Sequence, residues 1–155
     1  MRLSELINED AVTLRLKAST KREALVEMVE ILEHAHRFDS KGEILDQVVR
    51  REAMMTTGIG NGVAVPHGKA RSVDRVSAAC AVAPDGLDFD AEDGQPVYLL
   101  VLFVSPESAT SMHVRVLANL SRLLKEESVR QSLREAKSVS AFLATLHSAE
   151  AAHIP

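Results

Sequence analysis

The chain has 155 residues, of which 46% are hydrophobic and 26% charged, proportions typical of one folded globular domain and unlike those of a disordered chain. A net charge of −4, one tyrosine and no tryptophan argue against a nucleic-acid-binding protein, which usually presents basic and aromatic side chains together. Cys80 is the only cysteine, which excludes an internal disulfide, and the longest strongly apolar stretch, 97–104, is far shorter than the ~20 residues of a membrane helix. Acidic residues near the start argue against a signal peptide, so the sequence predicts a soluble cytoplasmic protein with no direct membrane insertion.

The first part of the chain predicts a short helix, a strand and a longer helix, in that order. Residues 3–7 predict the short helix, and residues 11–16 alternate apolar and polar side chains, the period of a half-buried strand. Thr20 and Glu23 have the spacing of a capping box, in which each side chain bonds the other residue's amide at a helix start. The helix that follows carries an apolar stripe at positions 24, 25, 28, 29, 32 and 35.

A second helix and a glycine-rich segment come next. Ser40 and Glu43 repeat the capping-box spacing, and the helix they begin has four apolar side chains on one face, Ile44, Leu45, Val48 and Val49. Residues 58–68 contain four glycines and a proline, a composition that excludes a helix. Within this segment, residues 63–65 predict a short strand that runs directly into the proline.

The middle of the chain predicts two buried strands joined by an acidic loop. Residues 73–83 are mostly apolar, as expected of a strand that is buried on both faces. Residues 84–86, Pro-Asp-Gly, predict a turn, and the acidic stretch 85–93 predicts an exposed loop or hairpin. Residues 97–104 have the pattern of a central strand.

The last part of the chain predicts three helices. The first begins near position 111 and places His113 on one face with Leu117, Leu120 and Leu124, so His113 points at least partly inward from the first turn. Two more helices and a frayed tail are expected at about 126–135, 138–148 and 151–155. Because strands alternate with helices, we expect a single α/β domain over residues 1–150, with helices on both faces of the sheet.

The glycine-rich segment ends in a histidine that is a candidate nucleophile. Its leading glycines are Gly58, Gly60 and Gly62. No Gly-Lys-Ser/Thr follows them, so a nucleotide P-loop is unsupported, but they leave the backbone free to approach a ligand. Pro66 fixes the approach to His67, and Gly68 leaves room for another molecule, so the imidazole should be accessible yet held. The alternatives are a tight surface loop and a structural histidine.

An imidazole in this position suits phosphoryl transfer. Its free pKa is about 6.5, so much of it is neutral and nucleophilic near pH 7. Attack on phosphorus by one ring nitrogen gives a phosphohistidine, whose labile P–N bond suits relay rather than storage. The other ring nitrogen should donate to a backbone carbonyl or a similar acceptor, which fixes the tautomer. We therefore expect His67 to accept a phosphoryl group and pass it on.

Phosphoryl transfer also requires positive charge and hydrogen-bond donors around the phosphate oxygens. Arg51 is a candidate because its planar guanidinium matches phosphate, and the first turn of the helix that carries His113 offers backbone amides and a positive dipole end. His113 is itself a candidate donor to the phosphate, with a structural histidine at the edge of the core as the alternative. Thr56 and Thr57 are expected either to donate hydroxyls or to cap the preceding helix.

Other kinds of site are poorly supported. The acidic stretch 88–94 resembles a calcium loop only faintly, because Leu99 stands where the bidentate glutamate belongs. His34 and His36 lie two positions apart on a predicted helix and therefore diverge, which argues against a zinc site. The Gly-x-Ser-x-Gly motif of serine hydrolases is absent. The sequence predicts no metal.

Several motifs along the chain together carry a family resemblance. Arg51-Glu52 is followed by the run Thr56-Thr57-Gly-Ile-Gly-Asn-Gly-Val-Ala-Val-Pro-His67-Gly-Lys69. Further on come Asp-Gly-Gln-Pro-Val at 93–97, the hydrophobic strand that ends at Pro106, and His113 with its leucine-rich helix. With these motifs, nearly the whole chain resembles the IIA domain of the bacterial phosphotransferase system (PTS), of the fructose/mannitol/nitrogen-regulatory type.

The resemblance implies a fold, a reaction and a donor. The fold is a mixed sheet with helices on both faces. The implied reaction is phosphorylation of His67 on Nε2 by the phosphocarrier protein HPr or a relative, assisted at the phosphate by Arg51 and His113. Phosphate then arrives on a protein, and no bound cofactor is expected. Threonine stands at 56 where the family often has serine, a change that keeps the hydroxyl.

Two functions from different classes follow from the resemblance. In the first, the protein is a regulator that resembles the nitrogen-regulatory IIA protein and binds target proteins according to its phosphorylation state. In the second, it is a component of a sugar transporter that hands phosphate to a IIB cysteine. Cys80 lies in a predicted buried strand and is a poor IIB nucleophile, and no membrane segment is present, so we expect a free-standing IIA unit and favour the regulator.

Overall fold

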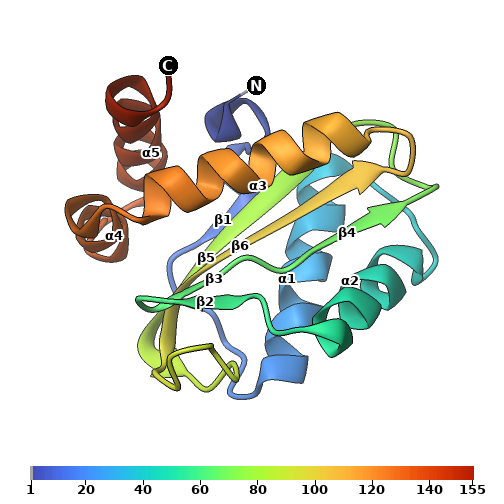
Figure 1. Cartoon of the computed structure of the whole chain (residues 1–155), viewed down its shortest axis with the longest axis horizontal. Helices are drawn as coiled ribbons and strands as arrows, with labels where there is room; N and C mark the ends of the chain where they lie inside the picture. The colour runs from blue at the N-terminus through green and yellow to red at the C-terminus, as the bar shows by residue number, and fades with distance from the viewer. Residues whose placement is uncertain (1) are drawn as a thin grey trace.

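The computed structural model describes residues 2–155 and contains one six-stranded mixed sheet (Figure 1). The strands span Val12–Thr13 (β1), Gly58–Gly60 (β2), Val63–Ala64 (β3), His67–Ala70 (β4), Ser77–Leu87 (β5) and Val97–Pro106 (β6). Their order is β1-β5-β6-β3-β2, and β4 also pairs with β6. β5 runs antiparallel to β6, whereas β3 and β4 run parallel to it, so β6 is central, as predicted.

Helices cover both faces of this sheet, which confirms the predicted α/β architecture (Figure 1). They span Lys21–His36 (α1), Glu43–Met54 (α2), Thr110–Leu124 (α3), Glu127–Arg134 (α4) and Val139–His153 (α5), with short 3₁₀ helices at Leu3–Glu5 (η1) and Glu9–Ala11 (η2). α1 and α2 lie against one face, and α3 crosses the other. Among residues 2–155 no helix is both long and apolar enough to cross a membrane.

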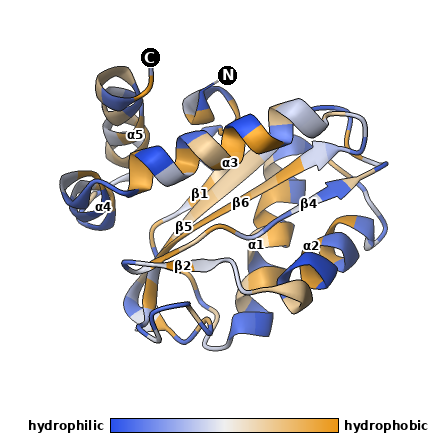
Figure 2. Ribbon diagram, in the orientation of Figure 1, coloured by the Kyte–Doolittle hydropathy of each residue, from blue (hydrophilic) through white to orange (hydrophobic). Residues whose placement is uncertain are grey.

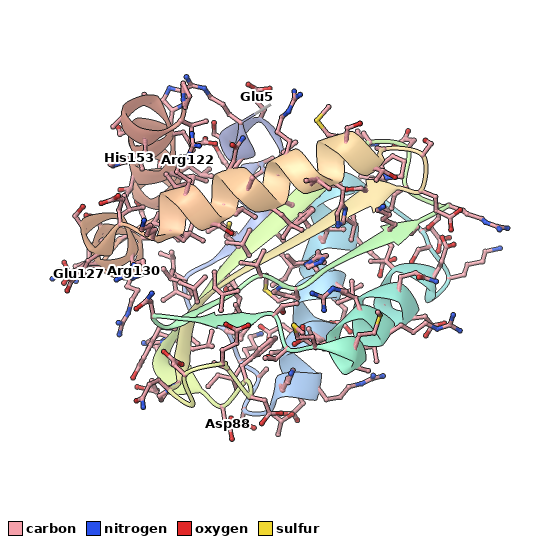
Figure 3. All side chains as sticks on the ribbon, in the orientation of Figure 1. Glu5, Asp88, Arg122, Glu127, Arg130 and His153 are labelled. Carbon is pink, nitrogen blue, oxygen red and sulfur yellow. The ribbon has the colours of Figure 1, made fainter. Side chains whose placement is uncertain are left out.

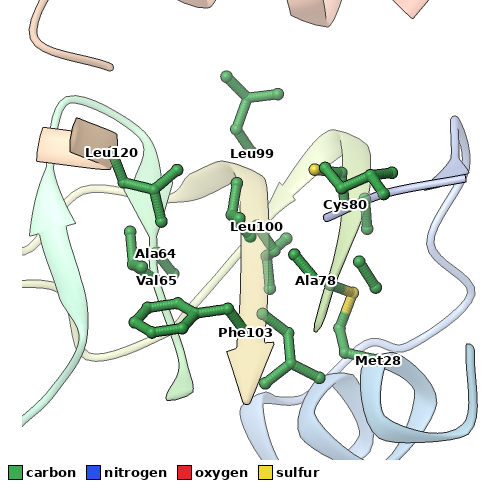
Figure 4. Close-up of a cluster of buried hydrophobic side chains, with 14 of the residues drawn as sticks. Met28, Ala64, Val65, Ala78, Cys80, Leu99, Leu100, Phe103 and Leu120 are labelled. Atoms are coloured by element: carbon green, nitrogen blue, oxygen red, sulfur yellow. The ribbon is translucent and has the colours of Figure 1, made fainter. Parts of the chain in front are cut away.

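The core is built around the two long strands. β5 and β6 are coloured as hydrophobic along most of their length in Figure 2, and their buried side chains contact helices on both faces. Figure 4 shows several side chains of this core, among them Leu100 and Phe103 of β6, Ala78 of β5 and Met28 of α1. Cys80 is also part of this cluster and is only 1% exposed, as its position in a predicted buried strand suggested.

The two predicted capping boxes behave differently. At the start of α1, the Thr20 hydroxyl accepts from the Glu23 amide at 3.2 Å, and the Glu23 carboxylate accepts from the preceding Ser19 amide. The prediction of a second box is wrong, because α2 begins after Gly42 and the Ser40 hydroxyl accepts from the Ile44 amide, at 3.3 Å, instead of from the Glu43 amide. The Glu43 carboxylate instead accepts from the amides of Arg71 and Ser72, which follow β4. Glu43 therefore ties α2 to the end of β4.

Two predicted strand boundaries are also wrong. The first strand is only two residues long, Val12–Thr13, rather than 11–16. The strand predicted at 73–83 begins at Ser77 and continues to Leu87, through the Pro-Asp-Gly sequence that predicted a turn. The pairing register with β6 shifts between Val82 and Leu87, so this sequence forms an irregularity within β5 instead of ending it.

The C-terminal helix is longer than its sequence suggests. α5 continues to His153, so residues 151–153, predicted as a frayed tail, are helical. Glu150 is 1% exposed, and its carboxylate accepts from the backbone amides of Leu3 and Ser4. The end of α5 is therefore fixed to η1, and the two lie near each other in Figure 1.

Candidate active site

The candidate nucleophile lies where the chain passes from β3 to β4 along one edge of β6. Pro66 separates the two short strands, and its carbonyl accepts from the Phe103 amide at 3.2 Å. His67, the first residue of β4, is paired with Phe103 in the parallel register. Pairing with a buried central strand therefore fixes the backbone on both sides of the histidine.

The imidazole of His67 is held by two contacts. Its Nδ1 lies 2.8 Å from the carbonyl oxygen of Val65, which confirms the predicted backbone acceptor. Its ring stacks on Phe103 with the centroids 5.2 Å apart and an interplanar angle of 15°. The residue is only 7% exposed, less than the accessible imidazole that the sequence predicted, and its ring packs against Phe103 and His113.

The hydrogen bond to Val65 determines which ring nitrogen of His67 is the nucleophile. A carbonyl oxygen only accepts, so Nδ1 carries the proton and Nε2 of the neutral ring keeps its lone pair. Nε2 of His67 has no hydrogen-bond partner among residues 2–155. Every fully buried side-chain nitrogen or oxygen in that range has one, so Nε2 is not fully buried. Burial lowers the pKa of His67, as does the charge of Arg51, while the bond to Val65 and the charge of Glu52 act in the opposite direction. The ring is therefore neutral at pH 7.

His113 lies beside His67, as the family resemblance implies. It is in the first turn of α3, is 7% exposed, and its ring centroid is 5.2 Å from that of His67. Its ring also contacts that of Phe103, with the centroids 4.8 Å apart. Its Nδ1 lies 2.9 Å from the oxygen of the Ser105 hydroxyl. Burial, followed by the charges of His67, Lys69 and Arg51, lowers the pKa of His113 to about 4. His113 is therefore also neutral at pH 7.

Two cations lie near the pair of histidines, and the Glu52 carboxylate also acts on His67. Arg51 lies near the end of α2, where its guanidinium donates to the carbonyl of Met55 at 2.7 Å, and its charge lowers the pKa of both histidines. Lys69 of β4 lies 3.3 Å from the Thr110 hydroxyl at the start of α3. The first turn of α3 contains no acidic residue, and its N-cap, Ala109, provides no side-chain cap. An anion next to the imidazoles would meet two cations and the positive end of a helix.

The two threonines have structural partners. The Thr56 hydroxyl donates to the carbonyl of Phe89 at 3.2 Å and accepts from the Gly58 amide. The Thr57 hydroxyl is buried and donates to the Glu52 carboxylate at 2.5 Å. Both hydroxyls thus order the loop after α2, and both already donate their proton to a protein oxygen. The expectation that they donate to a phosphate stays a prediction.

The glycines fit the loop to the rest of the protein. A Cβ on Gly58 would lie 2.8 Å from the Cα of Ala91, and a Cβ on Gly68 would lie 3.2 Å from the amide nitrogen of Val48 in α2. Gly60 and Gly62 have φ angles of 95° and 78°, which form the turn of the β2–β3 hairpin. The space beside Gly68 is therefore occupied by α2, and is not left for another molecule as predicted.

Sequence reasoning gave no role to Glu52, which proves to be central to the loop. Glu52 is 7% exposed, and its carboxylate accepts from the Thr57 amide at 2.7 Å and pairs with Lys21 at 3.0 Å. The Thr57 carbonyl in turn accepts from the Val65 amide, and the Val65 carbonyl accepts from His67. A chain of hydrogen bonds thus connects Glu52 to the nucleophile. Its position four residues after Val48, on the buried face of α2, was the available signal.

Two further observations limit what the rest of the surface can do. A hollow of about 550 Å³ is lined in part by Glu127 and Arg130, whose side chains project from α4 (Figure 3). Its lining carries both charge signs and includes neither candidate histidine, so it does not resemble a phosphate site. In the described part of the chain, no group of three or more His, Cys, Asp or Glu side chains is placed to hold a metal ion.

Comparison with known sequences places the chain in a family. Residues 5–149 match the family described as "Phosphoenolpyruvate-dependent sugar phosphotransferase system, EIIA 2". The chain is 33% identical over 143 residues to the PTS system fructose-specific EIIABC component of Bacillus subtilis, a match that covers 92% of this chain and 22% of that protein. It is 31% identical over 148 residues to the nitrogen regulatory protein of Bradyrhizobium diazoefficiens, covering 94% and 95% of the two chains.

Solved structures of the same kind share the fold. The nitrogen regulatory protein IIA-Ntr from Neisseria meningitidis superposes with a TM-score of 0.85 at 28% identity, covering 92% of this chain and 97% of that one. The complex of enzyme IIAMTL and phosphorylated enzyme IIBMTL from Escherichia coli matches with a TM-score of 0.78 at 26% identity, with the same coverage of both chains.

The mixed sheet with helices on both faces is thus the fold of a IIA-type domain. The chain belongs to the EIIA type 2 family of the phosphoenolpyruvate-dependent sugar phosphotransferase system. Its relatives include both nitrogen regulatory proteins and fructose- or mannitol-type IIA components. Domains of this family are phosphotransfer components that work with IIB domains, as in the complex of the mannitol proteins.

Proposed function

We propose that this protein is a phosphoryl carrier that accepts phosphate on Nε2 of His67 from an HPr-type phosphoprotein and relays it. The observation that carries the proposal is the 2.8 Å hydrogen bond between His67 Nδ1 and the Val65 carbonyl. It leaves Nε2 unprotonated, and the lowered pKa of His67 keeps that nitrogen a nucleophile at pH 7. Phosphate arrives on the donor protein, no bound cofactor takes part, and the exchange takes place in the cytoplasm.

The transfer step is a displacement at phosphorus. The Nε2 lone pair of His67 forms the new P–N bond while the bond from phosphorus to the donor's leaving atom breaks, and the donor keeps that electron pair. Charge that develops on the phosphate oxygens is stabilised by the Arg51 guanidinium, by His113 and by the first turn of α3. Lys69, which sequence reasoning left without a role, adds a second cation to this group.

The surface around the site suits a protein donor. Among the described residues, the large hydrophobic side chains that are exposed lie on the elements that carry the site: Met54 and Met55 at the end of α2, Ile59 in β2 and Val114 in α3. Val114 directly follows His113, and Met55 provides the carbonyl that Arg51 bonds. Exposed apolar side chains beside positive groups form the kind of surface that a protein partner buries on docking.

Phosphorylation of variants tests the carrier role. The His67→Ala variant should take up no phosphate from phosphorylated HPr, and labelling equal to that of the wild type would overturn the proposal. The His113→Ala variant should keep its circular dichroism spectrum but accept phosphate about 10- to 100-fold more slowly, because a donor to the phosphate is lost. A wild-type rate for that variant would return His113 to a structural role.

The direction of delivery distinguishes two functions. We propose a regulator of the nitrogen-regulatory type, supported by the TM-score of 0.85 to IIA-Ntr against 0.78 for the mannitol complex. The identity of 33% to a fructose-specific component supports the second candidate, a transporter component that passes phosphate to a IIB cysteine. Phosphorylated protein should change its affinity for a non-transporter target without losing its label to IIB domains. Efficient transfer of the label to a sugar-specific IIB domain would decide for the transporter.

A further inference from the structure

Ser105 lies directly behind the second histidine of the site. It is in β6, is 0% exposed, and is paired with Lys69 in the register of β4 and β6. Its hydroxyl oxygen lies 2.9 Å from Nδ1 of His113. Within residues 2–155 this is the only hydrogen bond that the Ser105 side chain makes.

The buried position of this hydroxyl determines the direction of the hydrogen bond. If Nδ1 of His113 donated to Ser105, the serine proton would be buried with no acceptor, and an unsatisfied buried donor is unfavourable by roughly tenfold or more in population. If Ser105 donates instead, its proton and the Nδ1 lone pair are both satisfied. The serine is therefore the donor, and Nδ1 of His113 is the acceptor.

We propose that Ser105 is a positioning residue that fixes the tautomer of His113 so that its Nε2 carries the proton. The inference rests on the function proposed above and adds a division of labour between the two imidazoles. The Val65 carbonyl leaves Nε2 of His67 bare, whereas Ser105 gives His113 an Nε2–H. One ring attacks phosphorus and the other donates to a phosphate oxygen, and no proton has to move between them during transfer.

Three features of the site support this arrangement. The two ring centroids are 5.2 Å apart, so a phosphoryl group on one ring lies close to the other. The low pKa of His113 keeps its ring neutral, so only one of its two nitrogens carries a proton. The tautomer therefore decides whether Nε2 presents a proton or a lone pair. Nε2 of His113 has no hydrogen-bond partner in the described residues. Every fully buried side-chain nitrogen there has one, so this Nε2 is not fully buried either.

Nitrogen-15 NMR of the imidazoles in the unphosphorylated protein tests the tautomers directly. We expect the Nδ1–H form for His67 and the Nε2–H form for His113. An Nδ1–H signal for His113 would overturn the proposal. Because this measurement needs no phosphoryl donor, its failure is distinguishable from a failure of His67 to carry phosphate.

Variants at position 105 test the consequence for transfer. In Ser105→Ala, the Nδ1 resonance of His113 should shift as its hydrogen bond is lost, and transfer should slow about two- to tenfold, the equivalent of one ordinary hydrogen bond. The tautomer of His67 should not change. In Ser105→Thr, the hydroxyl is kept but a methyl is added at a fully buried position, so the protein should be less stable, while in its folded fraction the resonance and the rate should return towards wild type.

Ser77 provides a matched control in the neighbouring strand. It is also a buried serine, 1% exposed, but its hydroxyl donates to the carbonyl of Arg75 and not to a histidine. Ser77→Ala should leave the His113 resonances and the transfer rate unchanged. If Ser105→Ala matched the Ser77→Ala protein in both measurements, Ser105 would be a packing residue and the proposal would be wrong.

Discussion

Replacement of Glu52 by alanine tests the hydrogen-bond chain that supports the nucleophile. The Glu52 carboxylate is nearly buried and has three partners: the amide and hydroxyl of Thr57, at 2.7 and 2.5 Å, and the ammonium of Lys21, at 3.0 Å. Glu52→Ala leaves all three donors without this acceptor. The two donors of Thr57 lie in a residue that is 3% exposed, so water cannot readily replace the carboxylate.

The expected loss of stability follows from these contacts. Each unsatisfied buried donor costs about 1–3 kcal/mol, and breaking a buried ion pair by removing one partner costs about 3–5 kcal/mol. The Lys21 side chain is 23% exposed and can turn towards water, which reduces its share. We therefore expect Glu52→Ala to lower the free energy of unfolding by about 3–5 kcal/mol. In a chain of this size that corresponds to a fall in Tm of roughly 6–20 °C.

Thermal and urea unfolding, followed by circular dichroism, provide the assay, and Glu43→Ala is the matched control. Glu43 is a carboxylate on the same helix that also bonds two distant amides, but it is only partly buried, so its loss should change the Tm clearly less. The folded fraction of Glu52→Ala should also accept phosphate more slowly, because the Val65 carbonyl loses indirect support. A loss below about 1 kcal/mol, or one equal to that of Glu43→Ala, would refute the reasoning.

Three further predictions concern packing, thiol chemistry and pH. Gly68→Ala should lower the free energy of unfolding by about 1–3 kcal/mol in urea titrations, because its Cβ would lie 3.2 Å from α2 backbone; an unchanged midpoint would show that α2 shifts without cost. Burial raises the pKa of the Cys80 thiol to about 12, so Cys80 should react with a thiol reagent only after unfolding, and rapid labelling of the native protein would contradict its buried position. The pKa of His113 is lower in the folded chain, at about 4, than in the unfolded chain, so between these pKa values the unfolded chain binds more protons. The free energy of unfolding should therefore be highest above about pH 6.5 and should fall as the pH falls towards 4, by at most about 3 kcal/mol. Unfolding titrations at pH 7, 5.5 and 4.5 should show this decrease, and His113→Gln should show less of it; equal pH dependence in the two proteins would rule His113 out as the cause.

The strongest sequence predictions were those in which local pattern and tertiary packing agree. The apolar run 97–104 predicted a central strand, and β6 is central and buried on both faces. Thr20 caps α1, as the spacing of Thr20 and Glu23 predicts. The second capping box failed although its spacing is the same. Glu43 has partners at residues 71 and 72, and a local pattern contains no information about such distant competitors.

The turn predicted at Pro84 failed for a related reason. β1 pairs with β5 only at Cys80 and Ala81, and the last bond on that side is from the Leu16 amide to the Val82 carbonyl. Among residues 2–155, no strand pairs with β5 on that edge beyond Val82, so a proline without an amide proton costs no sheet hydrogen bond there. Whether Pro-Asp-Gly ends a strand thus depends on the length of a neighbouring strand, which the local sequence does not show.

The same distinction applies to the site. His67 and Arg51 were found from their own motif, whereas Ser105 was not, because its role exists only through contact with a helix that follows it. Phe103 and Ser105 are two residues apart in β6, so their side chains point to the same face of the sheet. Phe103 stacks on His67, and Ser105 bonds His113. One face of one strand therefore supports both imidazoles, and the register of β4 on β6 sets the distance between them. A slip of that register by one residue would turn His67 to the opposite face, away from Phe103, and the hydrogen bond from the Phe103 amide to the Pro66 carbonyl is one of the contacts that oppose such a slip.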